Sequence, residues 1–146
     1  MALPSSGEFT HAGHMVIGAT PASLSAARKH VHSVAREHFS EDEAQDILIA
    51  VGEAISNAYR HGIPNRELGL IYVDWNYSGN TLTVSVKDEG PGLPPGSCLL
   101  TTDTALGLGR GFDIIRKTVD DFYIENDHGI KLVLKKRARR ELRIRS

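Results

Sequence analysis

One long helical segment constrains the fold of this chain more than any other feature. Ser40 is followed three residues later by Glu43, the capping-box pattern in which each side chain accepts a hydrogen bond from the backbone N–H of the other residue. Gly62 and Pro64 stand where such a helix should end, since glycine readily adopts the left-handed conformation and proline cannot continue a helix. The sequence therefore predicts a helix over residues 40–62. The residues on its predicted core face are Ile47, Val51, Ala54, Ile55 and Ala58.

Two further helices and five strands are predicted from the rest of the sequence. Thr20 and Pro21 are typical of a helix start, a side-chain cap followed by a proline whose missing N–H costs nothing there. This helix should reach about Phe39, and a third is expected over 112–121. Alternating apolar residues and the turn residues between them predict strands at 14–19, 68–77, 81–87, 122–125 and 129–134, with a hairpin turn at 78–80.

The composition is that of one globular domain. The chain has 146 residues, 40% hydrophobic and 24% charged, with a net charge of −1 that argues against a domain-wide attraction to nucleic acid. Its one cysteine, Cys98, excludes an internal disulfide and a cysteine metal cluster. We expect a flexible lead over 1–13 without a signal-peptide pattern, a domain over 14–136 and a basic tail over 137–146. No apolar run reaches the roughly 18 residues of a membrane span, so a cytoplasmic protein is expected.

A row of polar residues marks the long helix as a candidate site. Glu53, Asn57 and His61 recur every four residues, so they form one row that drifts by about 40° per step. A carboxylate and a carboxamide one turn apart offer hard oxygen ligands for Mg²⁺ together with a candidate general base. The ordinary alternative is a solvated helix face that also carries Asp42 and Asp46, and periodicity alone favours it.

Two glycine patterns follow later in the chain. Asp88 precedes Gly90 and Gly92 at the end of a predicted strand, where an acid can accept a hydrogen bond from a ligand amine while the bare backbone approaches closely. A plain β-turn would explain the same residues. The segment 107–111, Gly-Leu-Gly-Arg-Gly, stands directly before a predicted helix, where free N–H groups and the helix dipole suit a phosphate and Arg110 adds a matching charge. It has neither the Walker A ending nor the strand context of a dinucleotide-binding fingerprint.

The order of these three patterns resembles the Bergerat-fold (GHKL) ATPases, which include histidine kinase catalytic domains, gyrase and related chaperones. Within that superfamily the chain is most similar to the small anti-sigma-factor serine kinases of the RsbW and SpoIIAB type. Residues 53–62 resemble their N box, 88–92 their G1 box and 109–116 their second glycine box. The resemblance covers about residues 19–136. It implies an α+β two-layer sandwich, with a mixed, largely antiparallel sheet and helices packed on one face.

The resemblance also implies roles for the site residues. Asn57 would hold an Mg²⁺ ion that bridges the ATP phosphates, Glu53 would act as general base toward the attacking hydroxyl, and Asp88 would bind the adenine amino group. A structural role and a phosphate-side role both stay open for His61. Further cofactor contacts are expected from Gly90, Gly92, Gly107, Gly109, Arg110 and Gly111.

The implied function is that of an ATP- and Mg²⁺-dependent protein serine kinase that acts as an anti-sigma factor. Its phosphoacceptor would be a serine of an anti-sigma-factor antagonist, a STAS-domain protein. A sigma factor would be the second partner, bound by a homodimer. Neither a membrane nor a nucleic acid is expected as a partner.

Three other interpretations stay open. The domain could be an ATP-responsive binding module without kinase activity. It could be a histidine kinase catalytic domain with its acceptor among His30, His32 and His38 of the first helix, although these lack the following proline signature and are expected to be surface residues. It could bind nucleic acid through residues 135–145, which hold seven of the 17 lysines and arginines and are expected to be a solvated end.

Overall fold

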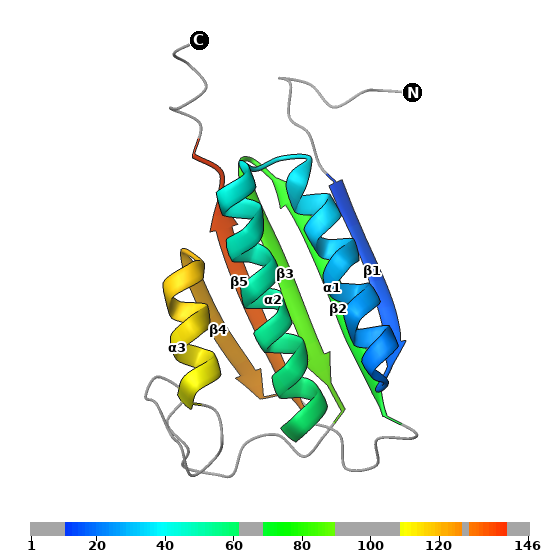
Figure 1. Ribbon diagram of the computed structural model, residues 1–146. Coiled ribbons are helices and arrows are strands. Elements are labelled where there is room, and N and C mark those ends of the chain that lie inside the picture. Colours follow the sequence, from blue (N-terminus) through cyan, green and yellow to red (C-terminus); the bar gives the residue numbers. More distant parts are fainter. Residues whose placement is uncertain (1–10, 62–68, 90–108, 127–128, 140–146) are drawn as a thin grey trace.

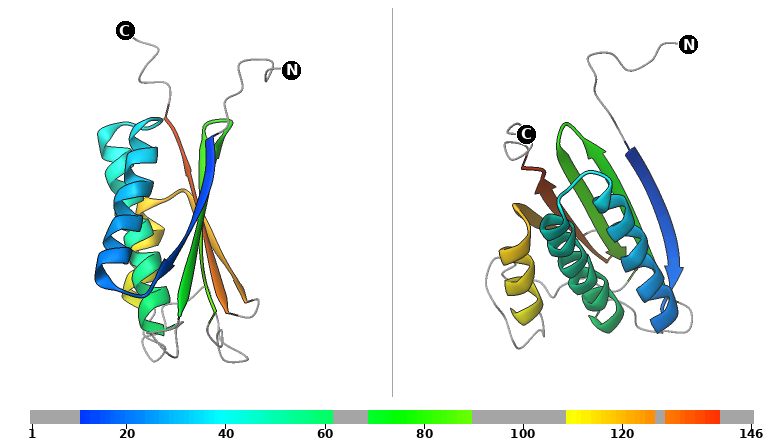
Figure 2. Two further views of the ribbon diagram at one scale, coloured as in Figure 1. Left: turned by 90° about the vertical axis from the view of Figure 1, so that its right-hand side faces the viewer. Right: turned by 45° about the horizontal axis from the view of Figure 1, so that its top comes forward.

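The computed structural model describes residues 11–61, 69–89, 109–126 and 129–139. Within these residues, three helices cover one face of a five-stranded sheet, which gives two layers (Figures 1 and 2). The elements along the chain are β1 (His11–Gly18), α1 (Pro21–Arg36), α2 (Glu41–His61), β2 (Leu70–Ser78), β3 (Thr81–Asp88), α3 (Gly109–Thr118), β4 (Asp121–Asn126) and β5 (Ile130–Arg137). The predicted two-layer sandwich is confirmed.

The strands lie in the order β1-β2-β3-β5-β4, and every pairing between described strands is antiparallel. The largely antiparallel sheet is therefore confirmed, while its mixed character is not seen in this part of the chain. The predicted hairpin joins β2 to β3 through Gly79 and Asn80, whose φ angles are 57° and 72°. Two positive φ angles in a two-residue loop match the right-handed twist of the strands on either side.

Both long helices begin as the sequence predicts. The Oγ1 atom of Thr20 accepts from the N–H of Ser23 at 3.1 Å, and Pro21 opens α1. At α2, the N–H of Ser40 donates to Glu43 Oε1 at 3.0 Å while the N–H of Glu43 donates to Ser40 Oγ at 3.2 Å, so the reciprocal capping box is confirmed. None of the described helices is both long and apolar enough to cross a membrane.

The core lies between the helices and the sheet, with α2 over its middle strands (Figure 1). All five predicted core residues of α2 are buried. Each large apolar side chain removed from water contributes about 1.5–3 kcal/mol before entropy is counted, so this face fixes α2 on the sheet. The largest fully buried side chains are those of Ile55, Ile71, Leu82, Ile115, Val31, Val51, Val73 and Val84.

The sheet begins earlier than predicted. Residues 11–13 belong to β1, not to a lead segment, and Gly13 pairs with Trp75 of β2. A Cβ atom on Gly13 would lie 2.5 Å and 2.8 Å from two atoms of the Trp75 ring, so the close approach of this ring requires glycine. The pattern placed the start of the strand three residues too late because a glycine contributes nothing to an apolar alternation.

The end of the chain also differs from the prediction. Strand β5 continues through Arg137, three residues past its predicted end, so the expected solvated end does not start at Lys135. Arg137 is exposed as expected, but Lys136 is not. Lys136 is 6% exposed, and its ammonium donates to the Thr118 carbonyl at 2.9 Å and to Asp46 at 3.4 Å. A buried lysine needs such partners, and here they join β5 to the end of α3 and to α2.

Helix α3 runs from Gly109 to Thr118, three residues earlier at both ends than predicted. The segment after it was expected to finish the helix, but Asp120 instead accepts from the Arg137 N–H through its Oδ2 atom at 2.6 Å, and its own N–H donates to the Lys135 carbonyl. These bonds direct the chain into β4, and long-range bonds of this kind leave no trace in local helix propensity.

We predict that Gly13→Ala destabilises the domain by about 1–3 kcal/mol, because the new methyl group must displace the Trp75 ring. Urea unfolding followed by Trp75 fluorescence measures the change. Gly18→Ala in the same strand is the control, since nothing lies within 4 Å of the Cβ position there, and it should stay within about 0.5 kcal/mol of the original. Equal unfolding midpoints for both variants would contradict the role given to Gly13.

Candidate functional site

The last turns of α2 contain a buried polar side chain. Asn57 is 8% exposed, so it does not belong to a solvated helix face, although Asp42 on the same helix does lie exposed. Its Oδ1 atom accepts from Arg60 Nη2 at 3.2 Å, while its Nδ2 atom is buried and has no hydrogen-bond partner among the residues that the structure describes. Leaving a buried polar group unpaired costs about 1–3 kcal/mol, and such exceptions call for an explanation. A ligand that pairs with this carboxamide is the explanation that the position favours.

A buried carboxylate stands at the end of β3. Asp88 is 2% exposed, and its Oδ1 atom accepts from the Ile130 N–H at 3.2 Å. Its neighbour Glu89 is exposed instead, where its Oε2 atom accepts from the Tyr72 hydroxyl at 2.8 Å. This hydrogen bond, with smaller contributions from burial and from the charge of Glu89, raises the pKa of Tyr72 above its usual value. Successive residues of a strand point to opposite faces, so Asp88 and not Glu89 is the inward acid.

Gly129 allows the backbone before β5 to pass close to Asp88, a role that the sequence patterns did not predict. Its φ of 130° lies in the region that favours glycine, and a Cβ atom there would collide with the Asp88 carbonyl oxygen. The backbone next to Ile130 therefore comes close enough to hydrogen-bond the carboxylate. The one signal in the sequence is a glycine at the start of a predicted strand, which by itself does not point to Asp88.

The three sequence patterns converge at one end of the domain. The C-terminal turn of α2, the end of β3 and the N-terminal turn of α3 all lie at the lower end in Figure 1, and α2 packs against both β3 and α3. Because α3 begins at Gly109, residues 109–111 of the glycine segment belong to its first turn instead of preceding it. The first N–H groups of a helix have no partner within the helix and attract anions.

Some of the predicted site lies outside the described residues. Gly90, Gly92 and Gly107 are among them. His61 is the last residue of α2, and Arg110 and Gly111 lie in the first turn of α3, but the structure describes only the backbone of these three residues. The roles predicted for these residues stay predictions.

Glu53 lies one turn before Asn57 but opens onto a different space. It is half-buried and lines a groove of 370 Å³ between α1 and α2. The other lining residues are Ser25, Arg28, Lys29, Leu48, Ile49, Gly52 and Ser56. Neither Asn57 nor Asp88 lines this groove. Those two residues lie near the end of α2 and at the end of β3, whereas Glu53 faces the groove between α1 and α2.

The arrangement offers three kinds of contact at this end of the domain. Asp88 provides a fixed acceptor, the Asn57 carboxamide provides a buried group that lacks a partner at Nδ2, and the start of α3 provides N–H donors. An acceptor for an amine and donors for an anion at one end of a sheet suit a ligand with a base and a phosphate chain.

Comparisons with known proteins identify the family of the chain. The sequence matches the histidine kinase-like ATPase domain over residues 17–136. The anti-sigma F factor of Clostridium beijerinckii is 30% identical over 103 residues, which cover 66% of this chain and 72% of that protein. The anti-sigma F factor of Geobacillus stearothermophilus is 30% identical over 131 residues, covering 84% of this chain and 90% of that protein.

A solved structure with a similar fold contains the RsbU and RsbW domains of Rv1364c from Mycobacterium tuberculosis. It superposes with a TM-score of 0.66 at 21% identity and covers 87% of this chain and 32% of that chain. This likeness concerns the fold, whereas the match over residues 17–136 spans most of the sequence. By that match, the chain belongs to the family of histidine kinase-like ATPase domains.

Proposed function

We propose that this domain binds ATP with Mg²⁺ and phosphorylates a serine of an anti-sigma-factor antagonist, and that it acts as an anti-sigma factor. The observation that carries the proposal is the buried Asn57 carboxamide with its unpaired Nδ2 atom, at the same end of the sheet as the fixed Asp88 carboxylate. The similarity to anti-sigma F factors over most of the chain supports the choice of biological role.

Asp88 is the proposed acceptor for the adenine amino group. A carboxylate accepts several hydrogen bonds at once, so the bond from Ile130 fixes its orientation without using up its capacity. At 2% exposure the group works in a medium of low dielectric, where a hydrogen bond to a charged acceptor is strong. Gly90 and Gly92 are proposed to let the base approach the backbone closely.

The phosphates are proposed to lie between the end of α2 and the start of α3. Asn57 fits a metal-bridged phosphate chain because its buried Oδ1 atom could bind Mg²⁺ in exchange for the bond from Arg60, while its unpaired Nδ2 atom could donate to a phosphate oxygen. Bound Mg²⁺ would offset the negative charge of the phosphate oxygens. The N–H groups of the first turn of α3, with Gly107, Arg110 and Gly111, are proposed as phosphate contacts, and His61 as a contact or a support.

Glu53 is the proposed general base. In the transfer, its carboxylate would take the proton of the acceptor serine as the serine oxygen bonds to the γ-phosphorus. The bond from that phosphorus to the bridging oxygen of ADP would break. The place of Glu53 one helical turn before Asn57 supports this role, because residues four apart on a helix lie side by side and the carboxylate would then stand next to the proposed phosphate site.

The partners proposed are a STAS-domain antagonist as phosphoacceptor and a sigma factor, the latter bound by a homodimer. A second candidate function is an ATP-responsive binding module that switches between these partners without transferring phosphate. The position of Glu53 favours that candidate, since its groove is lined by neither Asn57 nor Asp88.

Asp88→Asn should weaken ATP binding by at least about tenfold, because the amide would keep the bond from Ile130 through its oxygen and turn an N–H₂ donor toward the adenine amine. Calorimetric titration with Mg-ATP measures the affinity. The control is Glu89→Gln, which makes the same change one residue away, on the side chain bonded to Tyr72. An unchanged affinity in Asp88→Asn, or an equal loss in Glu89→Gln, would remove Asp88 from the adenine site.

Glu53→Ala should spare ATP binding but slow phosphate transfer by about 10²- to 10⁴-fold, the usual contribution of a positioned base. Transfer of labelled phosphate from ATP to a STAS-domain antagonist measures the rate, and acid stability of the product distinguishes phosphoserine from phosphohistidine. Asp42→Ala, an exposed acid at the other end of α2, serves as the control. Full activity in Glu53→Ala would exclude the residue as base, and binding of the antagonist without any transfer by the original protein would favour the binding module.

A further inference from the structure

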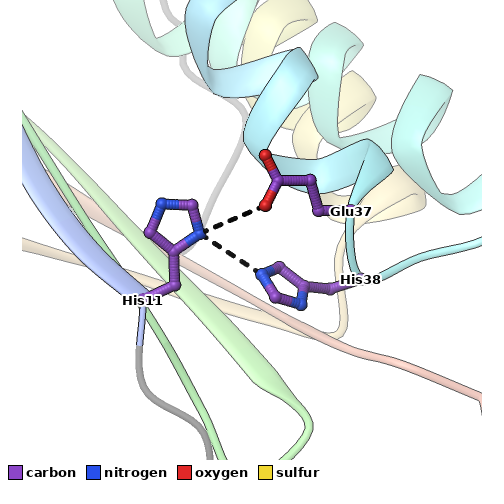
Figure 3. A group of neighbouring side chains, drawn as sticks. All are labelled: His11, Glu37 and His38. Carbon is purple, nitrogen blue, oxygen red and sulfur yellow. Dashed lines mark hydrogen bonds and ion pairs between the residues drawn. The ribbon is translucent and has the colours of Figure 1, made fainter.

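Two histidines and a glutamate converge at the end of the domain away from the proposed nucleotide site. They are His11 at the start of β1 and Glu37 and His38 directly after α1 (Figure 3). One ligand atom from each residue lies within 4.8 Å of the other two. His38 was predicted to be a surface residue of the first helix, but it lies beyond the end of α1 and is half-buried.

The spacing of these atoms suits a small metal ion. His11 Nδ1 lies 3.4 Å from His38 Nε2 and 3.7 Å from Glu37 Oε1. A tetrahedral ion with bonds of about 2.0–2.1 Å holds its ligand atoms about 3.3–3.4 Å apart. The Glu37 side chain is 60% exposed, so it can rotate and bring its carboxylate to the bonding distance of the ion.

The rings are held in place by the sheet. Tyr77 is the β2 partner of His11 in the strand register, and its ring stacks on His38 with centroids 3.9 Å apart and planes 11° apart. Tyr77 is itself 3% exposed and meets Phe39 edge-on. One buried tyrosine therefore holds the His38 ring by stacking and is the cross-strand neighbour of His11, and a ring held in place loses less entropy when a ligand orders it.

The local charge also favours a cation. Glu37 caps the C-terminus of α1, where its N–H donates to the carbonyls of Val34 and Ala35. The end of a helix carries a partial negative charge, and the Glu37 carboxylate adds a full one. Imidazole nitrogens with a carboxylate are typical ligands of zinc and related transition metals, whereas Mg²⁺ prefers oxygen ligands alone.

We propose that His11, Glu37 and His38 form a binding site for one divalent transition-metal ion of the zinc type. Three protein ligands leave a fourth position for water. The ion would tie the first residue of β1 to the residues that follow α1, joining segments 27 residues apart. Figure 1 places this corner at the upper end, opposite the last turn of α2 and the end of β3, so the site is separate from the proposed nucleotide site.

Calorimetric titration of the untagged full chain with Zn²⁺ tests the proposal. One equivalent should bind, while Mg²⁺ at the same concentrations should not bind at this site. His11→Ala and Glu37→Gln should each weaken zinc binding by at least about tenfold, since even the loss of an outer-shell partner commonly costs about 10- to 100-fold. His38→Phe should do the same while keeping an aromatic ring to stack on Tyr77, so a folding defect is not the cause.

The matched control is His14→Ala, on the same strand but paired with Asp74 at 3.3 Å, and it should bind zinc as the original does. Circular dichroism confirms that each variant is folded. Visible absorption of the Co²⁺-loaded protein should show a tetrahedral site that His11→Ala and His38→Phe both lose. Absence of zinc binding to the original protein, unchanged affinity in the three ligand variants, or an equal loss in His14→Ala would each overturn the assignment.

Discussion

The packing of α2 across the middle of the sheet is the constraint on which the rest of the structure depends. Its apolar face fixes the helix between α1 and α3 and over β3 and β5. That placement buries Asn57 near the end of α2, at the end of the domain where β3 closes with Asp88, and leaves Glu53 lining the α1–α2 groove. Stability and the candidate site thus come from one helix, because a single amphipathic pattern decides which side chains are buried and which of the polar ones go with them.

Local chemistry explains why most of the fold could be predicted from the sequence. Capping residues, a proline at the first helical position and a short hairpin turn each act within a few residues, and the structure confirms all three. The errors occur where distant contacts decide the outcome. Gly13 belongs to a strand because Trp75 covers it, and Lys136 is buried because Thr118 and Asp46 accept its hydrogen bonds.

The candidate site was predictable to the extent that its chemistry lies in short patterns. Asn57 and Asp88 were chosen for their side chains and spacing, and their burial at one end of the domain is consistent with that choice. The role of Gly129 could not be predicted from a short pattern, because it lets the Ile130 N–H reach an aspartate 42 residues away. The cluster of His11, Glu37 and His38 was not predicted for the same reason, since it joins residues far apart in the sequence. His11 belongs to the start of β1, which was assigned to a lead segment.

Amide hydrogen exchange with and without Mg-ATP tests the central claim most directly, because it locates a ligand on the backbone without altering any side chain. The account predicts that nucleotide slows exchange at the last turn of α2, the end of β3, the start of β5 and the first turn of α3. Exchange at the start of β1 and at Glu37 should stay unchanged. Protection confined to the opposite end of the sheet, or no protection at saturating Mg-ATP, would contradict a nucleotide site built around Asn57 and Asp88.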